Sequence, residues 1–184
     1  MKKLDSLRIL GIDVGAKISW FVLLKGSEVE SSGVLEELPK ADFAGIDSPL
    51  SHPAEGAFRE CERELLRRGV ALFPSGAPFF QKTVKRGIEI AEELRRRGTE
   101  VYEVYPYATR RILGIGVRKR KKREWREIGE ELRAYLRFDE LENEHILDAA
   151  LCALTVLLHL RGEGELISGK DGEILIPSQR ALAR

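Results

Sequence analysis

Residues 7–14 read LRILGIDV, a short apolar run that reaches an aspartate at position 13. A run of this length and composition predicts a buried central strand. A further apolar run follows at 18–24, and after the tight turn KGS at 25–27 a third, more polar strand is expected at 29–38. Because a parallel pair needs a crossover of about a dozen residues or more, three strands joined so closely predict an antiparallel meander.

The rest of the chain alternates between strand and helix patterns. Residues 43–47 form a fourth apolar run, which Ser48 and Pro49 end, and residues 101–105 form a fifth. Apolar residues at helical spacing, with glycine after several of the segments, predict the helices. The expected helices are 54–68, a second opened by Pro78 and followed by Gly98, a short one ending near Ile112, one around Trp125, and 143–160 with Asn143 as its N-cap.

A hairpin is expected at 166–176, around the turn GKDG at 169–172. Three meander strands, two more strands separated by helices, and a final helix are the order that RNase H-like domains show. The sequence therefore predicts one α/β domain over 1–184, of the RNase H-like class. Its sheet would be mixed and five-stranded, an antiparallel three-strand meander plus parallel strands, with flanking helices and a C-terminal hairpin.

The composition is that of a folded, water-soluble domain. Hydrophobic residues make up 43% and charged residues 33%, with a net charge of +1. No apolar run reaches the ~18 residues that a membrane span needs, and the first residues lack the apolar stretch of a secretory signal. We therefore expect a cytoplasmic protein with no membrane partner, in which Cys61 and Cys152 are buried free thiols. With Asn143 the only asparagine and Met1 the only methionine, the scarcity of thermolabile residues predicts a thermophilic source.

Positive charge is concentrated in one part of the chain. Residues 79–123 hold fourteen Lys or Arg against five Glu, and 118–123 are six consecutive cations. This asymmetry favours contact with a polyanion such as DNA or RNA, although a solvated loop explains the six cations equally well. The candidate phosphate contacts are Arg59, Lys82, Arg110, Arg118, Lys119 and Arg120, and for Arg59 and Lys82 a structural ion pair is the stronger alternative.

Four carboxylates occur among apolar neighbours, where an unpaired charge is costly. Asp13 and Asp47 each follow Gly-Ile at the end of an expected strand, Glu103 interrupts the fifth strand, and Asp148 lies inside the final helix. Strand ends in open α/β sheets gather functional groups, and the final helix can place Asp148, with Glu144 one turn earlier, over the same point. Oxygen ligands without histidine or cysteine favour Mg²⁺ or Mn²⁺. The predicted metal ligands are therefore Asp13, Asp47 and Asp148, with Glu103 as a fourth catalytic acid.

Each acid also has a structural interpretation. Asp13 would fit an Asx turn, and Asp47 before Ser-Pro resembles a helix cap. Glu103 would be satisfied by a basic neighbour such as Arg110 or Arg111. Asp148 has the weakest structural explanation, because aspartate is a poor helix former and lies too far inside this helix to cap it.

Several short motifs together resemble one family. They are GIDVG at 11–15, GIDSP at 45–49, Arg59-x-Cys61-Glu62, Phe73-Pro74-Ser75, Glu103-Val104-Tyr105-Pro106, His145-Ile146-Leu147-Asp148-Ala149, and GKDGEILIP at 169–177. Over 7–177 the chain resembles the family labelled domain of unknown function 429, predicted nucleases of RNase H-like fold. The resemblance implies that Asp13, Asp47, Glu103 and Asp148 are its acidic positions. The chain is also similar, more distantly, to RuvC-type resolvases, but it has one acid instead of a close pair in the core of the last helix.

These observations predict a nuclease that hydrolyses phosphodiester bonds through an acidic Mg²⁺ or Mn²⁺ site. A homodimer is a further possibility. Asp13 would be the central ligand, Asp47 and Asp148 the flanking ligands, and Glu103 a ligand or a base that orients water. His145 is expected at the surface, at the start of the final helix, and the alternative is that it contacts a ligand near Asp148. The alternative is a catalytically inactive binding module that keeps the acids for structure. A sugar-kinase or actin-like ATPase, which GIDVG also suggests, needs two such domains and does not fit 184 residues.

Overall fold

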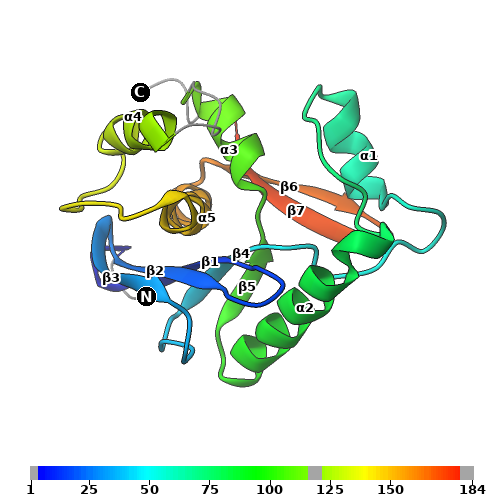
Figure 1. The fold of residues 1–184 in the computed structure, drawn as a ribbon, viewed down its shortest axis with the longest axis horizontal. Coiled ribbons are helices and arrows are strands. Elements are labelled where there is room, and N and C mark those ends of the chain that lie inside the picture. Colours follow the sequence, from blue (N-terminus) through cyan, green and yellow to red (C-terminus); the bar gives the residue numbers. More distant parts are fainter. Residues whose placement is uncertain (1–3, 116–121, 179–184) are drawn as a thin grey trace.

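The computed structural model describes residues 4–115 and 122–178 (Figure 1). A five-stranded sheet with the strand order β3-β2-β1-β4-β5 forms its centre, and β6 and β7 form a separate hairpin. The strands are β1 (Arg8–Asp13), β2 (Trp20–Lys25), β3 (Glu28–Val34), β4 (Phe43–Asp47), β5 (Glu100–Glu103), β6 (Gly164–Gly169) and β7 (Gly172–Pro177). The helices are η1 (Leu4–Ser6), α1 (Glu60–Arg67), η2 (Pro78–Phe80), α2 (Gln81–Arg96), α3 (Pro106–Leu113), α4 (Lys122–Leu132) and α5 (Glu144–Leu160).

The sheet is mixed, as the sequence predicts. β1, β2 and β3 form the antiparallel meander, whereas β4 lies parallel to β1, and β5 lies parallel to β4. In the parallel pair Gly11 lies beside Gly45 and Asp13 beside Asp47. The two Gly-Ile-Asp segments are therefore neighbours in space, with their aspartates at the same edge of the sheet.

Helix α5 covers one face of the sheet at very short range. A Cβ added to Gly11 would lie 1.9 Å from the carbonyl oxygen of Ala149, and one added to Gly45 would lie 2.7 Å from that of Cys152. Two glycines on adjacent strands therefore let the helix backbone lie directly on the strands. Nearly every residue of α5 after its first turn is buried, so this helix is the centre of the larger apolar core.

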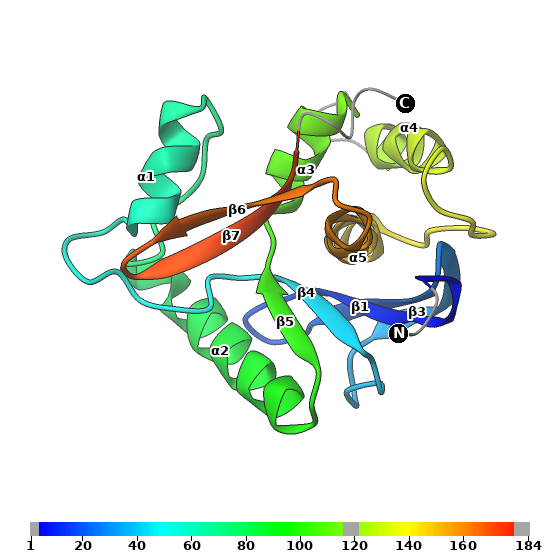
Figure 2. The ribbon, with the colours of Figure 1, turned by 180° about the vertical axis from the view of Figure 1, so that it is seen from behind.

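Helix α2 covers the opposite face (Figures 1 and 2). Side chains of a strand alternate between faces, so Ile12 and Ile46 point away from α5. They pack in a second apolar cluster with Ala91 and Leu94 of α2. Burial on both faces explains why β1 and β4 read as nearly continuous apolar runs.

The hairpin β6–β7 packs beside α1 and α3 and forms a third apolar cluster with them, which includes Leu65 and Ile174. At the hairpin turn, the Asp171 carboxylate accepts hydrogen bonds from the backbone N–H of Ala54 (3.0 Å) and of Glu60 (2.9 Å). The turn therefore caps the start of α1 from outside the helix.

One predicted helix begins later than expected. The spacing of apolar residues favours a helix over 54–68, but α1 starts at Glu60. Gly56 has a φ of +68°, which a right-handed helix excludes, and the Ala54 N–H is bonded to Asp171. Residues before Glu60 therefore belong to a loop that the hairpin holds. Among the residues described, no helix combines the length and apolarity needed to cross a membrane.

Candidate metal centre

Three of the predicted acids meet at one point. Asp13 ends β1, Asp47 ends β4, and Asp148 lies in the second turn of α5. One carboxylate oxygen from each lies within 4.8 Å of the other two, and all three residues are partly buried. Residues that are 34 and 135 or so positions apart along the chain thus form a single oxygen-rich group.

The Gly-Ile-Asp motif explains this convergence. Alternation along each strand places the glycine and the aspartate on the same face, the one that α5 covers. Ala149, whose carbonyl oxygen lies against Gly11, directly follows Asp148 on the helix. The contact that sets the height of α5 above the sheet therefore also sets the position of Asp148 relative to Asp13 and Asp47.

The group suits a hard divalent cation. All three donors are carboxylates, which Mg²⁺ and Mn²⁺ prefer, and no sulfur ligand lies in the group. Three negative charges so close together repel one another, and a cation between them would offset that repulsion.

His145 adds an imidazole to the group. Its Nδ1 lies 2.7 Å from Oδ2 of Asp13, and its ring stacks on that of Trp20, with centroids 5.6 Å apart and planes 6° apart. The side-chain oxygen of Asn143 accepts hydrogen bonds from the N–H groups of His145 and Ile146, which fixes the first turn of α5.

The predicted surface position of His145 is right, since its side chain is 51% exposed, but its contact with Asp13 was not foreseen. The sequence held a signal for it. His145 and Asp148 are three residues apart on one helix, and this spacing puts both on the same face.

Glu103 does not join the aspartates. It is 7% exposed, and its two carboxylate oxygens accept hydrogen bonds from the two terminal nitrogens of Arg59, one of them at 2.7 Å. The Leu50 N–H donates a further bond at 2.8 Å. Burial raises the pKa of Glu103, and its bonds with Arg59 oppose the rise. The arginine that forms these bonds, Arg59, lies 44 residues earlier in the chain.

Arg59 is engaged inside the protein. Its guanidinium also donates to Glu62, at 3.0 and 3.2 Å, and to Ser51, at 2.9 Å. Burial acts to lower the pKa of Arg59, but the hydrogen bonds and charge of Glu103 outweigh burial and raise it. The guanidinium is completely buried, so Arg59 serves as the structural ion pair foreseen as the alternative to phosphate contact.

The other predicted contacts are scattered. Lys82 is exposed on α2, Arg110 in α3 is only 6% exposed, and Glu144 is exposed in the first turn of α5. Arg118, Lys119 and Arg120 lie outside the described residues. The alternative role of Asp47 as a helix cap is wrong, because the next helix begins only at Glu60, with Arg59 as its N-cap.

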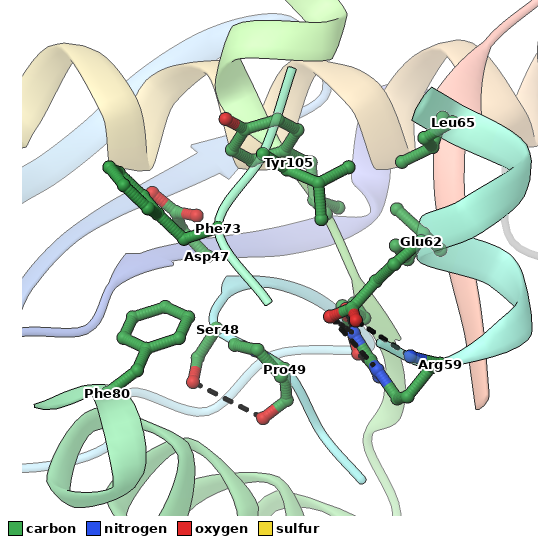
Figure 3. Close-up of a pocket in the computed structure, with 13 residues that line it drawn as sticks. Asp47, Ser48, Pro49, Arg59, Glu62, Leu65, Phe73, Phe80 and Tyr105 are labelled. Atoms are coloured by element: carbon green, nitrogen blue, oxygen red, sulfur yellow. Dashed lines mark hydrogen bonds and ion pairs between the residues drawn. The ribbon is translucent and has the colours of Figure 1, made fainter. Parts of the chain in front are cut away.

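A small pocket opens beside Asp47 (Figure 3). Aromatic side chains of Phe73, Phe80 and Tyr105 line it together with Asp47. The Tyr105 hydroxyl donates to the carbonyl of Ala71 at 2.9 Å. Burial raises the pKa of Tyr105 to about 12, and the nearby charge of Asp47 contributes to the rise. The sequence patterns favoured packing for Tyr105 and did not indicate this pocket.

Solved structures with the same fold include the T. thermophilus RuvC in complex with Holliday junction substrate. The match has 13% identity and a TM-score of 0.52, and covers 85% of this chain and 97% of that chain. The Thermus thermophilus RuvC structure matches with 15% identity and a TM-score of 0.47, over the same shares of the two chains. The first of these likenesses, at 13% identity and a TM-score of 0.52, concerns the fold, and it confirms the RNase H-like class.

No curated protein matches the chain. A family model described as "Protein of unknown function (DUF429)" matches residues 11–173, which span both Gly-Ile-Asp motifs, α5 and most of the closing hairpin. The resemblance indicated by the sequence motifs is therefore confirmed, and the chain belongs to the DUF429 family.

Proposed function

We propose that this protein is a nuclease that hydrolyses phosphodiester bonds of nucleic acid and uses Mg²⁺ or Mn²⁺. The observation that carries the proposal is the meeting of Asp13, Asp47 and Asp148, from two parallel strands and one helix, within 4.8 Å. Such a group has a structural cost, because it brings like charges together in a partly buried place. A bound cation would offset the repulsion between these carboxylates and would provide a reason for bringing them together.

Asp13, Asp47 and Asp148 would hold the cation, with Asp13 in the central position between a strand neighbour and the helix. A divalent cation in such a site polarises the phosphate and lowers the pKa of a bound water. Hydrolysis forms a bond from the water oxygen to phosphorus. It breaks the bond from phosphorus to one sugar oxygen of the nucleic acid backbone, and that oxygen takes up a proton. His145, at 2.7 Å from Asp13, is placed to orient that carboxylate and to hold a proton next to it.

The choice of nucleic acid as substrate has separate support. The RuvC structure of the same fold is described in complex with a Holliday junction substrate. In this chain the basic segment 118–123 leads into α4, and a run of cations suits contact with a phosphate backbone. Among the proposed ligand roles, that of Glu103 is the least supported, since Arg59 already binds both its oxygens.

The test is a cleavage assay with single-stranded, duplex and branched DNA and RNA, in Mg²⁺ or Mn²⁺. We expect wild-type cleavage, and a loss of at least about a hundredfold in Asp13→Asn, because a ligand of the cation is removed. The matched control is Asp139→Asn, which neutralises an exposed aspartate outside the group of three and should cleave normally. Equal cleavage by wild type and Asp13→Asn would remove the proposed site.

A second candidate function is a nucleic-acid-binding module without catalysis. The observation in its favour is the ion pair of Glu103 with Arg59, which turns one of the four predicted catalytic acids into a structural residue. Calorimetric titration with Mn²⁺ separates the two candidates. Mn²⁺ binding by the wild type that is lost in Asp13→Asn supports the nuclease. No Mn²⁺ binding by either the wild type or Asp13→Asn supports the module.

A further inference from the structure

The pocket beside Asp47 adjoins the group of three aspartates through this one residue. Asp47 contributes to the oxygen group and also lines the pocket, and Figure 3 shows its carboxylate among the side chains of Phe73, Phe80 and Tyr105. A ligand in this pocket therefore lies next to whatever binds at the aspartates. We call it the aromatic pocket, and its lining includes Pro49 and Leu72 besides these residues.

Two phenylalanines at its mouth are unusually exposed. Phe73 is 71% and Phe79 70% exposed, more than any other large hydrophobic side chain among the described residues. Their rings meet edge to face, with centroids 5.8 Å apart and planes 90° apart, and Phe79 also contacts Phe80 at 6.2 Å. Exposed rings grouped beside a cavity indicate a binding surface, because the folded chain gains little from them itself.

The loop that carries these rings is held by buried polar groups. Glu62 accepts hydrogen bonds from the hydroxyl of Ser75 at 3.0 Å and from its N–H at 3.4 Å. The Gln81 side chain donates to the carbonyls of Ser75 and Ala77, at 2.8 and 3.1 Å. The N–H of Gly76 donates to the carbonyl of Ala57 at 2.9 Å. The rings are therefore presented by an ordered loop, which lowers the entropy lost when a ligand binds.

The same polar groups connect to the floor of the pocket. Glu62 binds Arg59, and Arg59 binds Glu103. Three of the motifs that the metal centre leaves unexplained therefore meet here, those containing Arg59, Phe73 and Glu103. They form one structure, in which buried ion pairs fix an aromatic loop beside Asp47.

We propose that the aromatic pocket receives one unpaired nucleobase, from the strand whose phosphate lies at the three aspartates. This inference rests on the proposed function, and it narrows the substrate to nucleic acid with an unstacked base beside the cleaved bond. The group next to a backbone phosphate is a sugar and its base, and bases stack well on phenylalanine and tyrosine rings. A base of that strand can reach a pocket beside the site only after it leaves the helical stack.

The test compares binding with Ca²⁺ in place of Mg²⁺, so that the nucleic acid stays intact. The probes are fluorescent single strands, a duplex with one bulged base, and the matching continuous duplex, each as DNA and as RNA. Loss of one stacked base is expected to weaken binding of Phe73→Ala about 5- to 150-fold for the single-stranded and bulged probes. The continuous duplex should bind equally to both proteins, and Phe73→Trp should bind the bulged probe as wild type does.

Leu66→Ala is the control, since it removes an exposed apolar side chain from the far part of α1 and should leave binding unchanged. Phe73 is so exposed that its replacement should also leave the thermal unfolding temperature within about 1–2 °C of wild type. Photocrosslinking from 5-iodouracil at the bulge should reach residues 72–80 or Tyr105. Wild-type affinity of both Phe73→Ala and Phe79→Ala, or crosslinks only elsewhere, overturns the inference.

The outcomes separate the inference from the proposed function. Cleavage that depends on Asp13 but is the same in Phe73→Ala on every probe refutes the base pocket and leaves the nuclease. Crosslinks to the aromatic loop without cleavage by any metal refute the nuclease and leave the base pocket. Absence of binding to every probe refutes both.

Discussion

Arg59 is the largest completely buried side chain among the residues that the structure describes, and two carboxylates depend on it. Replacing it with methionine keeps much of the volume but leaves Glu62 and Glu103 without their cation. We expect Arg59→Met to lower the free energy of unfolding by about 3–5 kcal/mol, because removing one partner of a buried ion pair leaves the charge of the other partner buried and uncompensated. Denaturant titration followed by circular dichroism measures this difference.

Arg67 supplies the control on the same helix. It pairs with Glu64 at the surface, with its side chain 69% exposed, so Arg67→Met should change the free energy of unfolding by about 1 kcal/mol or less. Similar losses for the two variants would mean that the buried network is not what holds α1 against β5.

At the residue scale the sequence predicted the aspartates better than their neighbours. Asp148 could be singled out because an aspartate inside an apolar helix lacks a local explanation, and Asp13 and Asp47 share a motif. The pairing of Glu103 with Arg59 could not be read in this way. It depends on how the loop before α1 crosses the end of β5, and no local pattern encodes that path.

At the scale of elements, the contact of α5 with the sheet depends on glycine. Gly11→Ala would place a methyl group 1.9 Å from a backbone oxygen of α5, and Gly45→Ala would place one at 2.7 Å. Backbone atoms cannot move aside as easily as a flexible side chain. We therefore expect each substitution to lower the free energy of unfolding by about 1–3 kcal/mol or more, with the larger effect for Gly11→Ala. Thermal and denaturant unfolding provide the measurement.

Gly129→Ala tests whether the cost comes from the close approach. Gly129 lies inside α4, and an added Cβ would meet only the Leu141 side chain, at 3.8 Å. This substitution should stabilise the protein by up to about 1 kcal/mol, as alanine for glycine does inside a helix. If it destabilised the protein as much as Gly11→Ala does, contact with α5 would not be the cause.

The hairpin turn adds a pH-dependent contact to α1. Burial acts to raise the pKa of Asp171, but the N–H groups of Ala54 and Glu60 outweigh it, so that this pKa lies below its usual value. A lowered pKa in the folded state means that the contact stabilises the fold above about pH 4 and is lost as the pH falls through the folded value. Asp171→Asn should therefore be less stable than wild type at pH 7.

The difference in stability between wild type and Asp171→Asn should shrink as the pH is lowered below about 4, since both side chains are then uncharged. Unfolding curves at a series of pH values measure it. A constant difference across the range would show that the charge of Asp171 contributes nothing to the cap.

At the scale of the whole molecule, a cation held at the aspartates would connect β1, β4 and α5 and so stabilise the fold. Binding at a concentration a hundredfold above the dissociation constant adds about 2.7 kcal/mol. For a domain of this size that corresponds to roughly 5–10 °C in the unfolding temperature. We expect Mn²⁺ to produce this shift in wild type and in Asp139→Asn, and none in Asp13→Asn. An equal shift in all three proteins would place the ion elsewhere.

The overall architecture could be predicted because its signals are local. Apolar runs joined by short turns determine the meander, and alternating strand and helix patterns determine the parallel strands that follow. The aromatic pocket could not be predicted, since Phe73, Tyr105 and Asp47 come from three segments that become neighbours only when the hairpin and α1 are in place. Apolar residues in a loop give no indication of what they will face.

The stacking of Trp20 on His145 provides the protein with a native optical reporter of its acidic group. Of the two tryptophans, only Trp20 lies against this imidazole, which in turn contacts Asp13. Indole emission depends on the groups in contact with the ring, so the fluorescence of a Trp125→Phe variant would report the arrival of an ion at the aspartates, without any attached dye.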